Sequence, residues 1–273
     1  MSSNPIEKSA RFQQLHRGPA AFVRPNPWDA GSALLLAGLG FEALATSSAA
    51  CAQALGRRDG EITRDEALAH ARSIVAATDL PVSADLENGF GRTPGDAALT
   101  IRLAGEAGLV GGSIEDASGD PAKPLYDLNH AVARIAAAAT AARALPYRFM
   151  LTARSENFLR GNPNLEDTIA RLKAFEEAGA DVLMAPGLPD LAAVRAVCSA
   201  LSTPVNFMAG IRGKSFSVAE LEAAGVRRIS LATSLYRAAM TGLIDAAREV
   251  REQGSFGYLE HTIVTPDFNA FMR

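Results

Sequence analysis

The chain has 273 residues, more than an average domain but within the range of a single α/β barrel. Hydrophobic residues make up 48% and charged residues 21%, a balance that supports a sizeable core and excludes a disordered or collagen-like protein. Lysine and arginine total 27 against 30 acidic residues, and no basic run concentrates the positive charge, so nucleic-acid binding is not expected.

The N-terminal stretch, residues 1–18, has no hydrophobic centre of the kind found in a signal peptide. The longest apolar stretch, Ala131–Ala142, contains Arg134 and is much shorter than the roughly 20 residues needed to span a bilayer. We therefore expect no membrane segment. Cys51 and Cys198 lie in apolar stretches and cannot form a disulfide framework, which favours a cytoplasmic location.

Short runs suited to buried strands recur along the chain and alternate with stretches of helical periodicity. About eight βα units of this kind favour a parallel (β/α)₈ barrel, formed by the whole chain as one domain, over a doubly wound sheet with a GxGxxG turn. The predicted strands are Ala20–Asn26, Glu42–Thr46, Pro81–Asp85, Gly111–Glu115, Arg148–Ala153, Asp181–Met184, Val205–Met208 and Arg228–Leu231.

The segment after the eighth unit, residues 254–273, forms a C-terminal extension that is too apolar for a free tail. The helix predicted before it carries an apolar stripe that the extension continues. We expect this helix and the extension to pack on a partner subunit or to cover the barrel, and we expect a homo-oligomer. The stripe consists of Leu235, Ala238, Ala239, Leu243 and Ala247, continued by Phe256, Phe268 and Phe271.

The ends of the predicted strands are unusually polar, and a barrel enzyme builds its active site at those ends. Acidic residues cluster after the third and fourth strands. The polar residues at the strand ends are Asn26, Asp29, Thr46, Ser47, Ser48, Asp85, Glu87, Glu115, Asp116, Arg154, Glu156, Asn206 and Thr233. Among them, Asn206 is a candidate for substrate binding.

Three of these carboxylates, Asp85, Glu87 and Glu115, would repel one another in a cleft unless a cation or a bound proton offset their charge. A set of oxygen ligands without His or Cys favours Mg²⁺, with Mn²⁺ as the alternative, over Zn²⁺. A structural role is equally open, in which Asp85 and Glu87 cap a helix or pair with Arg92 and Arg154.

The sequence also argues against several chemistries. The lysines fall outside the predicted strands, which disfavours a Schiff-base aldolase. The four histidines lie on helices or near the termini, where we expect surface positions, and this disfavours a His-based triad or a His-ligated metal. Ser47 and Ser48 have no base nearby, so they are expected to contact substrate or to cap a helix. The histidines are His16, His70, His130 and His261.

Four groups of segments, in the same order, resemble the superfamily of phosphoenolpyruvate mutase and isocitrate lyase. The similarity implies a Mg²⁺-dependent barrel enzyme that acts on small 2-oxo or 2-hydroxy carboxylates, often a tetramer with exchanged C-terminal helices. The segments are Asn26–Ala30 with Ala43–Ser48, Leu55–Gly60, Ala84–Gly91, and Ile114–Asp116 with Ala153–Arg154.

The resemblance also implies roles for individual residues. Asp85 matches the principal metal ligand, and the carboxylates that match holders of its water shell are Asp59, Glu87 and Glu115. Ser47 and Ser48 match the turn that binds the substrate carboxylate. Arg154 matches an arginine that contacts the carboxylate and the oxygen that becomes an enolate, where positive charge lowers the barrier. Asp59 and Arg154 are therefore candidate catalytic residues.

The loop after the fourth strand, Ala117–Tyr126, departs from the family pattern. It lacks the Cys and His of the isocitrate lyase loop, and Lys123 is its only lysine. Ala185 and Ser234 replace histidines expected in a mutase and in an oxaloacetate decarboxylase. Tyr126 is the candidate acid in this loop, with packing against the barrel rim as the alternative.

Three functions stay open at this point. The first is a Mg²⁺-dependent lyase that cleaves a carbon–carbon bond, or decarboxylates, through a metal-stabilised enolate. The second is a phosphonomutase or phosphonopyruvate hydrolase, and the third is a non-catalytic binder of 2-oxo acids.

Overall fold

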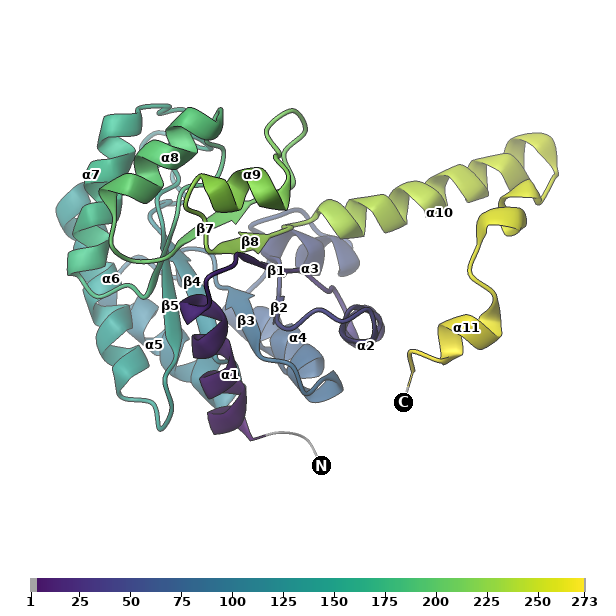
Figure 1. Cartoon of the computed structure of the whole chain (residues 1–273), viewed down its shortest axis with the longest axis horizontal. Helices are drawn as coiled ribbons and strands as arrows, with labels where there is room; N and C mark the ends of the chain where they lie inside the picture. The colour runs from purple at the N-terminus through teal and green to yellow at the C-terminus, as the bar shows by residue number, and fades with distance from the viewer. Residues whose placement is uncertain (1–3, 273) are drawn as a thin grey trace.

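The computed structural model of the protein describes residues 4–272 and shows eight parallel strands surrounded by helices (Figure 1). Each strand pairs with the next from β2 to β8, and β8 pairs with β1. A backbone hydrogen bond of 3.0 Å from Ala45 N to Pro25 O joins β2 to the residue after β1. The strands are β1 Phe22–Arg24, β2 Leu44–Ala45, β3 Val82–Asp85, β4 Gly111–Glu115, β5 Met150–Arg154, β6 Val182–Met184, β7 Val205–Met208 and β8 Arg228–Ser230.

The predicted (β/α)₈ barrel is confirmed, and each predicted strand region overlaps an observed strand. The helices are α1 Pro5–Arg17, α2 Ala30–Gly38, α3 Ser48–Ala54, α4 Arg64–Ala77, α5 Pro94–Glu106, α6 Leu128–Arg143, α7 Leu165–Glu177, α8 Leu191–Ala200, α9 Val218–Ala223, α10 Ser234–Gln253, the 3₁₀ helix η1 Gly257–His261 and α11 Thr265–Asn269. No helix of the described residues is long and apolar enough to cross a membrane.

Side chains at the helix starts explain where α2, α4 and α5 begin. The side chain of Asp29, the N-cap of α2, accepts a hydrogen bond from the backbone N–H of Ser32. In return, the Ser32 hydroxyl oxygen accepts one from the backbone N–H of Asp29. Thr63 and Thr93 make the same reciprocal pair at the starts of α4 and α5. Because such caps satisfy N–H groups that a helix leaves unpaired, they fix the turns that follow the strands.

Helix α1 closes the barrel at the N-terminal ends of the strands. Phe12 in this helix is fully buried and packs in one cluster with Phe22, Val110 and Val182, which lie in or beside β1, β4 and β6. The cluster fills the floor of the barrel with apolar side chains. The opposite end, where the strands finish, is left for the active site.

The expectation that the histidines lie at the surface is wrong for His16, which is 7% exposed at the end of α1. Its Nδ1 lies 2.7 Å from the Phe12 carbonyl oxygen and its Nε2 lies 3.2 Å from Nη1 of Arg228. Burial and the Arg228 charge lower the pKa of His16 to about 3, so the ring is neutral. A neutral imidazole can then accept a hydrogen bond from the arginine, which explains its interior position.

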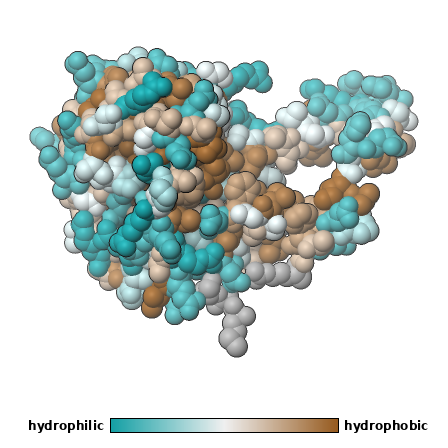
Figure 2. Space-filling model, viewed as in Figure 1, coloured by the Kyte–Doolittle hydropathy of each residue, from teal (hydrophilic) through white to brown (hydrophobic). Residues whose placement is uncertain are grey.

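Helix α10 leaves the barrel and extends into solvent, and the chain then turns back through η1 and α11 (Figure 1). We call residues 234–272 the C-terminal arm. Tyr236 is the one buried residue of α10, whereas Leu243 and Phe256 are 61% and 59% exposed. Phe271 returns to the barrel side, where its ring lies against Gly38 at the end of α2. Hydrophobic surface lies along the arm and on the adjacent flank of the barrel (Figure 2).

Candidate active site

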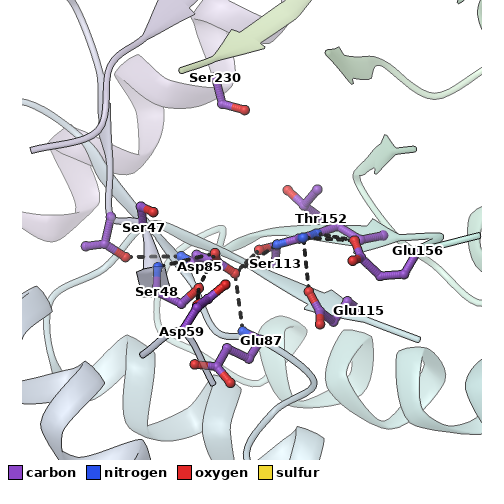
Figure 3. Close-up of polar contacts among 12 residues, drawn as sticks. Ser47, Ser48, Asp59, Asp85, Glu87, Ser113, Glu115, Thr152, Glu156 and Ser230 are labelled. Carbon is purple, nitrogen blue, oxygen red and sulfur yellow. Dashed lines mark hydrogen bonds and ion pairs between the residues drawn. The ribbon is translucent and has the colours of Figure 1, made fainter. Parts of the chain in front are cut away.

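A cavity of about 960 Å³ lies where the strands end, the position at which barrel enzymes place their sites. One side of its wall comes from β2 to β5 and the turns that follow them. This side carries the predicted residues Ser47, Ser48, Asp59, Asp85, Glu87 and Glu115 (Figure 3) and also Arg154. Seven residues from distant parts of the sequence therefore meet in one cavity: the strand-end pattern predicts six of them, and the family resemblance points to Asp59.

Arg154 at the end of β5 is the centre of this group. Its Nη1 lies 3.0 Å from Asp85 Oδ1, and its Nη2 lies 3.1 Å from Glu115 Oε2. Its Nε and Nη2 also donate to Glu156 Oε1, at 3.1 and 2.8 Å. Although burial opposes the charged form, these three carboxylates raise the pKa of Arg154 well above its usual value. The guanidinium is thus permanently charged and held in one orientation.

Asp85 sits at the end of β3, and groups besides Arg154 donate hydrogen bonds to its carboxylate. The Ser48 hydroxyl donates to Oδ2 at 3.0 Å, and the backbone N–H of Glu87 donates to Oδ1 at 3.3 Å. Burial alone would raise the pKa of Asp85, but Arg154 and these hydrogen bonds outweigh it and hold the pKa below its usual value. Asp85 is therefore an ionised carboxylate at the base of the site, as the first ligand of a cation must be.

The turn after β3 forces Glu87 and Phe90 into left-handed backbone conformations, with φ of +49° and +53°. Such values are unfavourable for residues other than glycine and gather at functional sites. The turn aims Glu87 into the cavity, where its Oε1 is buried without a hydrogen-bond partner. Burial, together with the charges of Asp85 and Asp59, raises the pKa of Glu87 to about 7.

Asp59 enters the cavity from the segment between α3 and α4 and accepts a hydrogen bond of 3.1 Å from the Ser48 hydroxyl. Burial and the neighbouring Asp85 raise the pKa of Asp59 above its usual value. A buried oxygen without a partner on Glu87 and two carboxyl groups that repel Asp85 fit a bound divalent cation, which would offset all three charges.

No three carboxyl, imidazole or thiol side chains of the described residues are close enough together to form a metal cage of their own. Asp85 would therefore hold the ion directly, with Glu87, Asp59 and Glu115 placed to accept hydrogen bonds from its water ligands. Mg²⁺ suits such an arrangement because it keeps several waters and needs few protein ligands.

Glu115 at the end of β4 is shared between two arginines. Its Oε2 lies 3.1 Å from Arg154 and its Oε1 lies 3.4 Å from Nη2 of Arg160. Burial, followed by the charge of Glu156, raises the pKa of Glu115 well above its usual value.

The two predicted serines line the cavity, but both hydroxyls already have partners. Ser47 caps α3, where its side chain accepts from Ala50 N at 3.4 Å, as one of the two predicted roles requires. Ser48 Oγ bridges the two carboxylates Asp85 and Asp59. Contact of Ser47 and Ser48 with a substrate therefore stays a prediction.

Asn206 and Tyr126 are not among the described residues that line the cavity. Asn206 lies deeper in the barrel, where its Nδ2 donates to Ser230 Oγ at 3.0 Å and its Oδ1 accepts from Arg228 at 2.8 Å. The Tyr126 ring packs beneath the Arg134 guanidinium, 4.7 Å from the ring centre, and its buried hydroxyl has no partner. This geometry matches the packing alternative for Tyr126 and gives Asn206 no direct route to a ligand.

Several cavity residues are not predicted as site residues by the sequence, among them Glu156, Arg160 and Arg24. Glu156 was noted only as polar, although it makes the shortest contact with Arg154, and Arg160 lies beyond the strand end. Arg24 occupies the last position of β1, and a charged residue within an apolar strand was the signal that could have revealed it.

The barrel, the acidic strand ends and the central arginine define an enzyme of the phosphoenolpyruvate mutase/isocitrate lyase superfamily. The model of the phosphoenolpyruvate phosphomutase family matches residues 12–251, and the chain belongs to that family.

Similar proteins agree with this assignment. A crystal structure of a protein from Burkholderia cenocepacia J2315, provisionally described as a lyase/mutase, is 52% identical, with a TM-score of 0.96 over 98% of this chain and 96% of the other. Oxaloacetate decarboxylase of Paraburkholderia xenovorans is 28% identical over 98% of this chain and 94% of its own length. The 2,3-dimethylmalate lyase of Eubacterium barkeri is 27% identical with the same coverage. At the level of enzyme class, the predicted carbon–carbon lyase is confirmed.

Proposed function

We propose that the chain is a Mg²⁺-dependent enzyme that cleaves a carbon–carbon bond, with or without loss of CO₂, in a small 2-oxo or 2-hydroxy carboxylate. The observation that carries this proposal is the contact of one buried arginine, Arg154, with three carboxylates beside the buried, unpartnered Oε1 of Glu87. Anionic substrate and cation can then meet beside a fixed guanidinium.

Each residue has a part in that reaction. Asp85 would hold a divalent cation, which would supply a Lewis acid for the oxygen on C2 of the substrate. Glu156 holds Arg154 through Nε and Nη2, and Nη1, which pairs with Asp85 in this structure, would turn to the same oxygen as negative charge grows there once a cation holds Asp85. Because Arg154 is already oriented by Glu156 and Glu115, little reorganisation is needed as the bond breaks.

Relatives support this class of substrate. Oxaloacetate decarboxylase and 2,3-dimethylmalate lyase are named for reactions on small dicarboxylates, and both align along most of this chain. The family model is that of a phosphomutase, so cleavage or transfer at a carbon–phosphorus bond is the second candidate. A non-catalytic binder of 2-oxo acids is the third.

Turnover measurements separate the three. The purified protein is offered oxaloacetate, 2,3-dimethylmalate, 2-methylisocitrate and phosphonopyruvate, each with Mg²⁺ and with excess EDTA. The proposal expects turnover of at least one of the first three with Mg²⁺ and its loss with EDTA. Turnover of phosphonopyruvate alone favours the second candidate, and ligand binding without any turnover favours the third.

The C-terminal arm supports a homo-oligomer, a dimer or a tetramer. Large apolar side chains along it are open to solvent, with Leu259, Ile263 and Val264 each more than half exposed. Exposed apolar surface on this scale marks an interaction site in a folded protein. We propose that a second copy of the chain covers this surface, by exchange of the arms or by direct packing. Cytoplasmic location stays a prediction.

A further inference from the structure

Two arginines lie inside the barrel next to each other in the sheet, one in β1 and one in β8. The register pairs Arg24 with Ser230 and Phe22 with Arg228. Neither arginine forms an ion pair with an acidic residue in the described part of the chain. Burial of a guanidinium without a counter-charge costs free energy of folding. The hydrogen-bond partners of each arginine therefore indicate its role.

Arg228 is satisfied by neutral partners. Its Nε donates to Asn206 Oδ1 at 2.8 Å, its Nη2 donates to Thr152 Oγ1 at 2.7 Å, and its Nη1 reaches His16 Nε2 at 3.2 Å. All three nitrogens are used, and the side chain is fully buried. Arg228 therefore serves the barrel interior and has no nitrogen left for a ligand.

Arg24 differs in each of these respects. It lines the cavity, and only its Nη1 donates to another described residue, the hydroxyl of Ser83. Its Nε is buried without a hydrogen-bond partner. Burial lowers the pKa of Arg24 to about 10, with the Asp85 charge opposing the change, so the group is still charged at neutral pH. A cation with unused donors faces the cavity.

Arg24 also stands apart from the other cavity arginines. Arg154 and Arg160 pair with carboxylates, and Arg64 donates to Thr100 and to backbone carbonyls. Ser230, the sheet neighbour of Arg24, lies away from the carboxylates of β3 and β4 (Figure 3). Of the described lining residues on β7, β8 and β1, Arg24 is the charged one. Its backbone pairs with Ser230 of β8, which pairs in turn with Met208 of β7, and its guanidinium reaches Ser83 on β3.

The cavity thus has two places for negative charge. One is the cation site with Arg154, and the other is Arg24, close enough for the charges of Arg154 and Asp85 to act on it. We propose that Arg24 binds a second carboxylate of the substrate, so that the site selects short dicarboxylates over monocarboxylates of the same length. This inference rests on the proposed function only in taking this cavity as the substrate site.

A matched pair of ligands tests this selection without turnover. Malate and 2-hydroxybutanoate share the 2-hydroxy carboxylate and differ only in a carboxylate or methyl group at the far end. Dissociation constants are measured by calorimetry with saturating Mg²⁺. Because hydrogen bonds to charged groups contribute about 1.5–3 kcal/mol, wild type should bind malate at least about tenfold more tightly.

Arg24→Met should weaken malate binding by at least about tenfold and change 2-hydroxybutanoate binding by less than about threefold. Arg24→Lys keeps the charge and should retain part of the preference. Equal losses for both ligands would show that Arg24 acts through Asp85, and an unchanged preference would show that it does not touch the ligand; either result overturns the inference.

Circular dichroism and thermal unfolding verify the fold of each variant, and Arg24→Gln replaces Arg24→Met if the latter does not fold. The inference and the proposed function fail separately. Loss of the malate preference with normal turnover rejects Arg24 as the selecting residue. Lack of turnover in wild type with an intact, Arg24-dependent preference rejects the lyase and leaves the dicarboxylate site.

Discussion

Arg154 Nη1 and Asp85 Oδ1 lie 3.0 Å apart across the mouth of the barrel, one at the end of β5 and the other at the end of β3. The proposed cation ligand and the proposed substrate-binding cation are therefore in direct contact. If Asp85 held a divalent ion, Nη1 of Arg154 would become available for a substrate oxygen. The proposed function therefore predicts that cation binding and substrate binding are coupled through this ion pair.

Removal of the Asp85 carboxylate tests the metal site. Asp85→Ala should abolish Mg²⁺ binding and reduce kcat by at least about a hundredfold, with the circular dichroism spectrum unchanged. Mn²⁺ binding followed by electron paramagnetic resonance gives a readout that does not depend on activity. Asp65→Ala removes a carboxylate at the rim of the same cavity and should keep both properties. Full activity of wild type in excess chelator would contradict metal dependence.

Replacement of Arg154 by lysine tests its role in stabilising developing charge. Lysine keeps one positive charge but cannot hold Glu156 with two nitrogens while donating to Asp85 or to a substrate oxygen. Arg154→Lys should lower kcat by about tenfold to a hundredfold and raise KM by less. Steady-state kinetics on the best substrate decide this, with Arg102→Lys, which alters only an exposed ion pair with Glu106, as the control. An unchanged kcat would remove Arg154 from the chemistry.

Tyr126→Phe separates an acid from a packing residue. The ring stays beneath Arg134, and the change removes only a buried hydroxyl that has no partner. We expect turnover within about twofold of wild type and a gain in unfolding free energy of up to about 1 kcal/mol, measured by urea unfolding. A loss of at least about tenfold in kcat would instead assign Tyr126 to proton transfer.

The buried His16 predicts a pH dependence of stability. Its pKa is about 3 in the folded protein and near 6.5 in an unfolded chain, so the unfolded state binds more protons between these values. Stability should therefore rise with pH from about 3 to 6.5, by at most about 1.4 kcal/mol per pH unit from this group. His16→Gln should flatten that slope in urea unfolding at several pH values. His261→Gln, in an exposed position, should leave it unchanged.

Deletion of residues 254–273 tests the role of the arm. It removes Phe256 and the apolar residues of η1 and α11, together with the contact of Phe271 on Gly38. The truncated protein should elute as a smaller species than the full chain or become insoluble. Light scattering coupled to gel filtration gives the masses. A full-length protein that elutes as a monomer, and is unaltered by truncation, would refute the oligomer.

The strands and the acidic wall were predictable because their signals are local. The periodicity of hydrophobic residues and the turn residues between elements mark each βα unit. Residues at the carboxyl ends of parallel strands then meet at one end of the barrel, whatever the details of packing. Asp85, Glu115 and Arg154 follow from this rule. Their ion pairs do not, since the pairing depends on side-chain reach across the barrel.

Other features depend on contacts between distant segments, which local patterns do not reveal. His16 looked like a surface residue because α1 reads as a polar helix, yet the helix end turns the ring toward Arg228. Arg24 was missed because its strand looked like ordinary core. Tyr126 lies in the loop after the fourth strand and Asn206 in the seventh strand, as predicted. Their side chains contact Arg134 and Arg228, respectively, and do not line the cavity.

Helix α1 closes the floor of the barrel with Phe12, so the cavity has no opening at the N-terminal ends of the strands. Whatever enters must arrive by the strand-end mouth and must depart through it. Substrate and products therefore use the same opening, and a product cannot leave through the floor of the barrel while a new substrate enters at the mouth. If the proposed cleavage takes place here, both fragments share this one exit, and release of the slower fragment limits how soon the next substrate can bind.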